Sequence, residues 1–268
     1  MSEAGLELRE EAEVLSQRLF GSNARRRAAL AEQLMGICEK LPGRDFLLIH
    51  NPGGWGSTAL DGLLQWEKSI VDGVSSTVER MGYSYLLVQY FRCGDGWWSH
   101  MQDIKEQTYF LFKGNSRKAR ELAAELRFIT AHFSNLKILL IGASQGAAFS
   151  NAVMRQISEF PHVYSIELGL FFPHMSRRVI TERTLAIDDN GIMPDPMAHR
   201  NLWVGFKAYL TAPGRWVKYR LNGEPQKFTY CINAPGHDYN WEYLAVRKRV
   251  EEFLHIKFGI KNKLEVRA

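Results

Sequence analysis

The chain lacks the long apolar stretch that a membrane-spanning helix needs. No apolar run approaches the ~20 residues that cross a bilayer, so we expect no integral membrane segment. The N-terminal MSEAGLELREE is polar and acidic, without the apolar core of a secretory signal peptide. These two absences lead us to expect a cytoplasmic protein.

Cysteine is also scarce. The three cysteines are odd in number and widely spaced, which excludes a disulfide framework and argues against a zinc site. No group of His, Cys, Asp and Glu has the spacing of metal ligands, and neither a Gly-x-Gly-x-x-Gly fingerprint opening a helix nor a P-loop is present. We therefore expect no metal and no cofactor.

Concentrated charge of one sign is missing, although the formal net charge is +5. The densest basic cluster, Arg25-Arg26-Arg27, falls in a predicted helix. A solvated helix face explains it better than a phosphate-binding patch, so we expect no nucleic-acid partner.

What the chain has is enough apolar material for one large core. Its 268 residues are 46% hydrophobic, and no repeat or linker divides them, which favours a single domain over 1–268. Apolar residues at helical spacing predict a helix over 4–20 and a second helix that reaches Leu41, so residues 1–42 form a helical extension packed on the core.

Short apolar segments then alternate with helical ones, which is typical of an α/β protein. We expect strands at 46–50, 83–90, 136–141, 163–169 and 183–187. We expect helices at 59–81, 116–133, 198–212 and 240–257. Alternation on both sides of Asn222-Gly223 predicts a hairpin of 216–221 with 227–232.

One apolar strand, Leu136–Ile141, ends in Gly142-Ala143-Ser144-Gln145-Gly146, and a small-residue segment that suits a helix follows. This order predicts a tight strand–turn–helix with Ser144 at the turn. The two glycines lack a Cβ, so the turn can be sharp and the helix can pack closely on neighbouring strands.

These residues resemble the nucleophile elbow of the α/β-hydrolase superfamily, in which a serine stands on such a turn. The resemblance implies a three-layer fold with a mostly parallel central sheet flanked by helices. The two N-terminal helices stand here in place of the usual first strands. It also implies an upstream loop that donates an N–H to an oxyanion, followed downstream by an acid and then a histidine.

A glycine-rich loop, Asn51–Ser57, follows the strand at 46–50 and resembles that oxyanion loop. Pro52 has no N–H, so Gly53 or Gly54 is the expected donor, together with Gln145, the residue after the nucleophile.

The catalytic base that the resemblance implies is His237, in a Pro-Gly turn between the last predicted strand and the last helix. The acid is expected after the strand at 183–187, where three aspartates stand. Asp189 is the first choice, Asp195 the second and Asp188 the third. The other expected site residues line a substrate pocket; they are Trp55, Trp97, Trp98, Phe171, Phe172 and Met175. Trp97 and Trp98 fit a role in the core equally well.

The resulting hypothesis is a serine hydrolase with a Ser144–His237–Asp189 triad. Its partner would be a small-molecule carboxylic ester or thioester, cleaved through an acyl-enzyme. A catalytically inactive hydrolase fold that binds a ligand or partner is the alternative from another class. Amide, peptide or carbon–carbon substrates stay open, because neither fold nor triad fixes the substrate.

Overall fold

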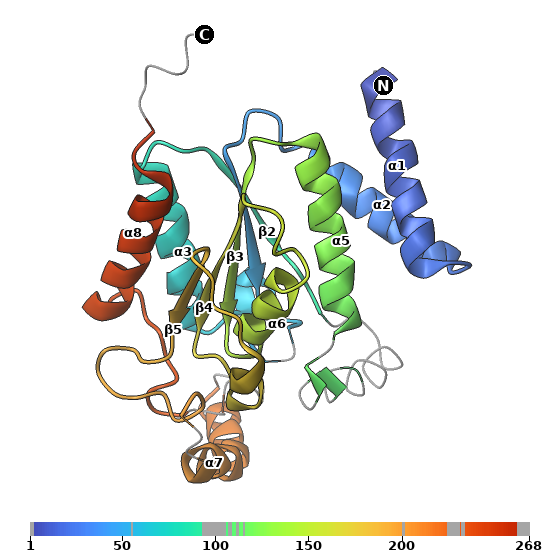
Figure 1. Cartoon of the computed structure of the whole chain (residues 1–268). Helices are drawn as coiled ribbons and strands as arrows, with labels where there is room; N and C mark the ends of the chain where they lie inside the picture. The colour runs from blue at the N-terminus through green and yellow to red at the C-terminus, as the bar shows by residue number, and fades with distance from the viewer. Residues whose placement is uncertain are drawn as a thin grey trace.

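A parallel sheet forms the centre of the computed structural model, which describes residues 3–54, 56–92, 106, 109–110, 113–114, 116–199, 202–223, 231 and 234–261. The described strands form a five-stranded sheet in the order β2-β1-β3-β4-β5, with every neighbouring pair parallel (Figure 1). They are β1 (Phe46–Asn51), β2 (Tyr85–Gln89), β3 (Lys137–Ala143), β4 (Val163–Leu168) and β5 (Thr184–Ile187). The prediction of an α/β protein with a parallel sheet is confirmed.

The sheet is central because its middle strands are apolar on both faces. Every residue of β1 is buried, and so is every residue of β3 after Lys137. A parallel strand covered on both faces needs such a continuous apolar run, which is why these segments are recognisable in the sequence.

Helices cover both faces of this sheet and give the molecule three layers (Figure 1). On one face, α3 (Gln65–Arg80) and α8 (Leu244–Phe258) pack together over a core that includes Val74 and Val250. On the other face, α5 (Arg117–His132) and α6 (Gln145–Met154) bury residues such as Leu126 and Ala152. The predicted helices at 59–81, 116–133 and 240–257 are therefore present, the first preceded by the short helix η1 (Leu60–Gly62).

The N-terminal extension is helical, as the apolar spacing predicts. It consists of α1 (Glu3–Phe20) and α2 (Ala24–Cys38), which pack on each other, and α1 also contacts α5. Asn23 caps α2, because its side chain accepts a hydrogen bond from the N–H of Arg26 at 3.1 Å. Leu34 of α2 is fully buried in the core cluster that α5 and α6 share.

The expected hairpin at 216–221 is wrong, because this segment belongs to α7 (Leu202–Leu221). The helix continues through Pro213 and ends at Asn222-Gly223, where Gly223 has a φ of +77° and its N–H bonds to the carbonyl of Arg220. A hairpin turn and a helix C-terminus both favour glycine at positive φ, so the dipeptide suits either structure. Of the expected partner strand 227–232, only Cys231 is among the described residues. Within the described ranges, no helix combines the length and the apolar character needed to cross a membrane.

The winding of the sheet reverses between β1 and β3. The chain leaves β1 through α3 on one face and enters β2, then crosses by α5 on the opposite face to reach β3 on the other side of β1. In the register of these strands Asn51 pairs with Gly142, so the loop after β1 and the turn after β3 lie side by side. Ligands of open α/β sheets bind at such a reversal.

Candidate active site

Ser144 stands on a strained turn between β3 and α6. Its backbone adopts φ 55° and ψ −116°, and among the described residues it is the only non-glycine with a positive φ. A side chain in this region costs roughly 1–3 kcal/mol and persists only where the surroundings enforce it. The N–H of Ser144 is held by the carbonyl of Leu168 on β4 at 2.8 Å. The predicted strand–turn–helix is therefore present, with its strain centred on the serine.

The two flanking glycines explain how the turn is enforced. A Cβ on Gly146 would lie 2.0 Å from the carbonyl oxygen of Asn51, and one on Gly142 would lie 2.4 Å from that of Gly146. Both contacts are with backbone that has no room to move. A larger residue at Gly146 would push α6 away from the loop after β1, and one at Gly142 would push α6 away from the end of β3.

The loop after β1 presents two expected donors, and the structure distinguishes between them. Gly53 donates its N–H to Glu67 Oε1 of α3 at 2.8 Å. Gly54 has a φ of +54°. Its N–H finds no acceptor among the residues that the structure describes. The N–H of Gln145, at the first turn of α6, likewise has no acceptor there. Gly54 and Gln145 therefore present free donors on the two sides of the sheet reversal.

His50 orients the carboxylate that holds Gly53. It is buried on β1, and its Nε2 lies 3.2 Å from Glu67 Oε1 while its Nδ1 lies 3.0 Å from Gln89 Nε2. Since the Gln89 amide nitrogen can only donate, Nδ1 accepts and the proton sits on Nε2, facing Glu67. This assigns His50 and Glu67 a structural role in shaping the loop.

Arg92, which follows β2, ties the loop to the elbow. It is 2% exposed, and its guanidinium donates to the carbonyls of Pro52 at 2.5 Å, Gly54 at 2.9 Å and Gln145 at 3.4 Å. The rigid, permanently charged guanidinium of Arg92 thus fixes the spacing between Gly54 and Gln145, the two residues whose N–H groups are free. No pattern in the sequence assigned Arg92 a role. Arg92 stands three residues after the end of β2, a strand whose residues are only partly buried, so its sequence context does not indicate these contacts.

His237 is paired with Asp195. His237 Nδ1 donates to Asp195 Oδ2 at 2.7 Å, and the hydroxyl of Tyr239 donates to the same oxygen at 2.7 Å. The other oxygen accepts the N–H of Met197 at 2.8 Å. Burial opposes ionisation of this fully buried carboxyl, but the hydrogen bond and charge of His237, with Tyr239 and Met197, hold the pKa of Asp195 below its ordinary value.

The expectation that Asp189 pairs with His237 is wrong. Asp189 has a side chain 52% exposed, accepts the N–H of Gly191 and forms an ion pair with Arg249 at 3.4 Å. Asp195, the second choice, stands in the expected place. The reason is tertiary packing: Arg249 of α8 engages Asp189, whereas the turn before His237 packs next to Asp195, since a Cβ on Gly236 would lie 2.7 Å from the carbonyl oxygen of Pro194.

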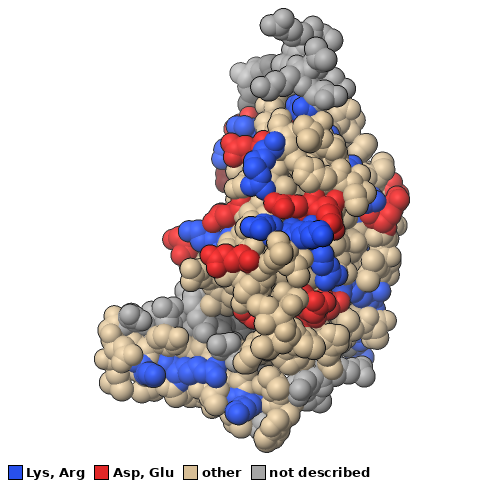
Figure 2. Space-filling view, turned by 90° about the vertical axis from the view of Figure 1, so that its left-hand side faces the viewer, with Lys and Arg blue, Asp and Glu red and all other residues tan. Residues whose placement is uncertain are grey.

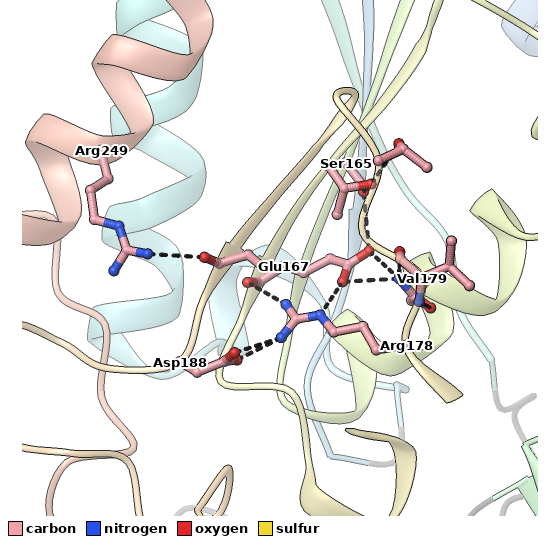
Figure 3. Close-up of polar contacts among 10 residues, drawn as sticks. Ser165, Glu167, Arg178, Val179, Asp188 and Arg249 are labelled. Carbon is pink, nitrogen blue, oxygen red and sulfur yellow. Dashed lines mark hydrogen bonds and ion pairs between the residues drawn. The ribbon is translucent and has the colours of Figure 1, made fainter. Parts of the chain in front are cut away.

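Asp188, the third choice, is held in a separate buried network (Figure 3). Arg178 donates to both oxygens of Asp188 at 2.8 and 2.7 Å and to Glu167 Oε2 at 3.0 Å. Glu167 also accepts the amide of Asn151 and the hydroxyl of Ser165. These residues come from β4, from α6 and from the segments that follow β5 and η2 (Phe172–Arg177). The network therefore fastens these elements together, and both of its carboxylates are engaged.

The serine and the histidine–aspartate pair lie at neighbouring points of the sheet edge. Gly169 follows Leu168, which bonds the N–H of Ser144, and a Cβ on Gly169 would lie 2.6 Å from Asp195 Oδ2. The ring of Trp66, beside Glu67 on α3, meets the ring of His237 edge-on at 6.4 Å. Among the residues that the structure describes, no hydrogen bond joins Ser144 Oγ to His237. Such catalytic hydrogen bonds are often long when no substrate is bound.

The expected pocket residues have different positions. Phe172 donates its N–H to the carbonyl of Met197 beside Asp195, and its ring meets that of Phe171 at 5.0 Å. Met175 packs against the core cluster on the α5 and α6 side of the sheet. Trp55, Trp97 and Trp98 lie outside the described residues.

In the part of the chain that the structure describes, no group of three or more His, Cys, Asp or Glu side chains is arranged to hold a metal ion. No protein-family model matches the chain, and no curated protein matches it significantly. The features of this site that bear on function are the strained Ser144, the Asp195–His237 pair and the N–H groups of Gly54 and Gln145.

Proposed function

We propose that this protein is a serine hydrolase of the α/β-hydrolase type, which cleaves a carboxylic ester or thioester through an acyl-enzyme. One observation carries the proposal: a serine is held in a strained backbone conformation at the reversal of a parallel sheet, beside a partly exposed histidine that is paired with a buried aspartate. Strain of this kind is retained at functional sites because it exposes the hydroxyl.

In this mechanism His237 removes the proton of Ser144 as the hydroxyl attacks the substrate carbonyl. Its Nδ1–H donates to Asp195, so Nε2 carries the lone pair and is the basic nitrogen. The ionised Asp195 stabilises the imidazolium that forms. Tyr239 and Met197 donate to Asp195 and fix its orientation without supplying a competing charge.

The negative charge that develops on the carbonyl oxygen needs preorganised donors. The N–H groups of Gln145 and Gly54 supply them, and Arg92 sets the distance between the two. Gly53 is excluded as a donor, because its N–H is engaged by Glu67. His237 then protonates the leaving alcohol or thiol, which leaves the acyl group on Ser144. In the second half of the reaction His237 activates a water molecule, which hydrolyses this acyl-enzyme and frees Ser144.

A fluorophosphonate probe tests the proposal, because it reacts with activated serines. We expect one adduct, located on Ser144 by peptide mass analysis, and loss of the adduct in Ser144→Ala and His237→Ala. Ser158→Ala is the matched control, since this exposed serine uses its backbone carbonyl and not its hydroxyl in the structure.

The same variants are assayed with p-nitrophenyl esters. We expect both site variants to lose at least ~10³-fold in kcat, as triad knockouts do. A folded protein that takes no label, under conditions that label a known serine esterase, contradicts the proposal and favours the inactive, ligand-binding alternative.

A further inference from the structure

Helix α7 carries an apolar stripe on its outward side. Trp203, Leu210, Val217 and Leu221 are 71, 63, 48 and 82% exposed. Their spacings of seven, seven and four residues place them on one face of the helix. Single exposed apolar side chains are ordinary, but an aligned row over a whole helix marks an interaction surface.

The opposite face of α7 is the one packed on the protein. Ala208 is 3% exposed and Ala212 is fully buried, and both lie about half a turn from the stripe. Arg215, on the inward side, donates to the carbonyl of Cys231 at 3.1 Å. Ala208 and Ala212 therefore face the protein, and Leu210, Val217 and Leu221 point away from it.

The stripe is bordered by positive charge. Lys207 and Lys218 are exposed along one edge, and Arg220 lies along the other with its guanidinium 4.1 Å from the ring centroid of Trp216. The twenty residues of α7 contain four basic residues and no acidic one, against a net charge of +5 for the whole chain. Figure 2 shows this part of the molecule, at the lower left, as blue and tan without red.

We propose that α7 docks on an anionic lipid bilayer, with its axis in the plane of the surface and the stripe among the acyl chains. An apolar face between basic flanks, too polar to span a membrane, is the pattern of an interfacial helix. Lysine and arginine stems can extend along the stripe and keep their charges at the lipid phosphates.

Charge distinguishes this occupant from a second copy of the chain. A self-complementary contact through the stripe would bring Lys207, Lys218 and Arg220 against the same residues of the partner, with no carboxylate on α7 to compensate. The stripe also gives α7 an apolar face that phosphate contacts to a nucleic acid would leave exposed.

Docking through α7 would also orient the molecule. The helix lies beyond the carboxyl ends of the strands (Figure 1), the edge where the turn of Ser144 is found. The bilayer would therefore face that edge. The inference is independent of the proposed hydrolase activity, because it concerns binding alone.

Vesicle flotation with the full chain tests the proposal. We use vesicles of phosphatidylcholine alone and vesicles with about one third phosphatidylglycerol, and we expect at least ~10-fold stronger binding to the anionic ones. Two double variants, Leu210→Glu with Val217→Glu and Lys207→Glu with Lys218→Glu, should each lose binding at least ~10-fold.

Matched controls lie on α8. Ile256→Glu and Lys248→Glu place the same charges on side chains that are 78% and 69% exposed, and both should bind as the unaltered protein does. Ser144→Ala should also bind normally, which separates this test from that of the proposed activity. Circular dichroism confirms that each variant is folded.

Equal binding to both kinds of vesicle, or binding that the α7 variants leave unchanged, overturns the proposal. So does sedimentation of the unaltered chain as a dimer that Leu210→Glu with Val217→Glu converts to a monomer without any vesicle binding. That result would assign the stripe to a second copy.

Discussion

At the scale of single residues, the contacts of three nearby aspartates decide which of them pairs with His237. Asp188, Asp189 and Asp195 all follow β5, but Arg178 holds the first, Arg249 pairs with the second, and only the third meets His237. The selection depends on side chains that stand 10, 60 and 42 residues away from the three aspartates.

Asparagine substitutions separate these aspartates functionally. If the proposed mechanism holds, Asp195→Asn should lower kcat by ~10³–10⁴-fold, because a neutral amide neither fixes the tautomer of His237 nor stabilises the imidazolium. Asp189→Asn, at an exposed ion pair, should stay within about twofold of the unaltered protein. Steady-state rates with a p-nitrophenyl ester measure both, and equal losses in the two variants would contradict the assignment.

The sequence identifies much of this site, because chain order and turn chemistry are local properties. Ser144 and Gln145 stand at the strand–turn–helix that their flanking residues predict, and His237 stands in a turn before the last helix, as expected. The choice between Gly53 and Gly54 needs Glu67, fourteen residues away from Gly53 on another element. No periodicity or spacing in the sequence predicts the contact between Gly53 and Glu67. The contacts of Arg92 with the loop and the elbow are equally absent from the sequence pattern.

At the scale of elements, the joint between β3 and α6 depends on the absence of two side chains. Gly146 lies against the backbone of Asn51, the residue at which the loop that contains Gly54 begins. The packing of a helix on a neighbouring strand therefore sets the position of a proposed donor.

Gly146→Ala tests this dependence. Its Cβ would lie 2.0 Å from a carbonyl oxygen, so we expect a loss of roughly 1–3 kcal/mol or more in the free energy of unfolding, measured in urea. Gly214→Ala is the matched control, because no atom lies within 4 Å of its Cβ position on α7. It should be neutral or stabilising by up to ~1 kcal/mol, and equal effects at both sites would refute the packing argument.

Elements with strong periodicity or a continuous apolar run are predicted well. The strands from β1 to β5 and the helices α1 and α2 follow such patterns, with bounds within about three residues of the expected ones, whereas α3 begins six residues later than expected. The failure at 216–221 has a physical cause, since Pro213-Gly214 and Asn222-Gly223 both look like breaks. Tertiary packing through Ala208 and Ala212 favours the helix instead.

At the scale of the whole molecule, the N-terminal helices cover a buried carboxyl group. Glu125 of α5 is 4% exposed and accepts the amide of Gln33 from α2 at 3.3 Å. Burial, with the nearby charge of Glu121, raises the pKa of Glu125 to about 8. The folded protein therefore keeps a proton there that the unfolded chain releases near pH 4.5.

Stability should consequently fall as pH rises from about 4.5 to about 8, since unfolding releases this proton in that range. The slope from one such group approaches ~1.4 kcal/mol per pH unit. Glu125→Gln removes the titration, so we expect a flatter profile and a gain in stability above pH 8. Urea unfolding across this range measures it, with the exposed Glu10→Gln as a control that should leave the slope unchanged.

The strained turn at Ser144 imposes an evolutionary compromise on the chain. Its backbone conformation would be adopted most readily by glycine, which lacks the hydroxyl, so the most stable residue at this position is one that is unable to act as a nucleophile. Selection for stability alone would therefore drive the position towards glycine. Under the proposed function, the hydroxyl of Ser144 is what offsets this loss of stability.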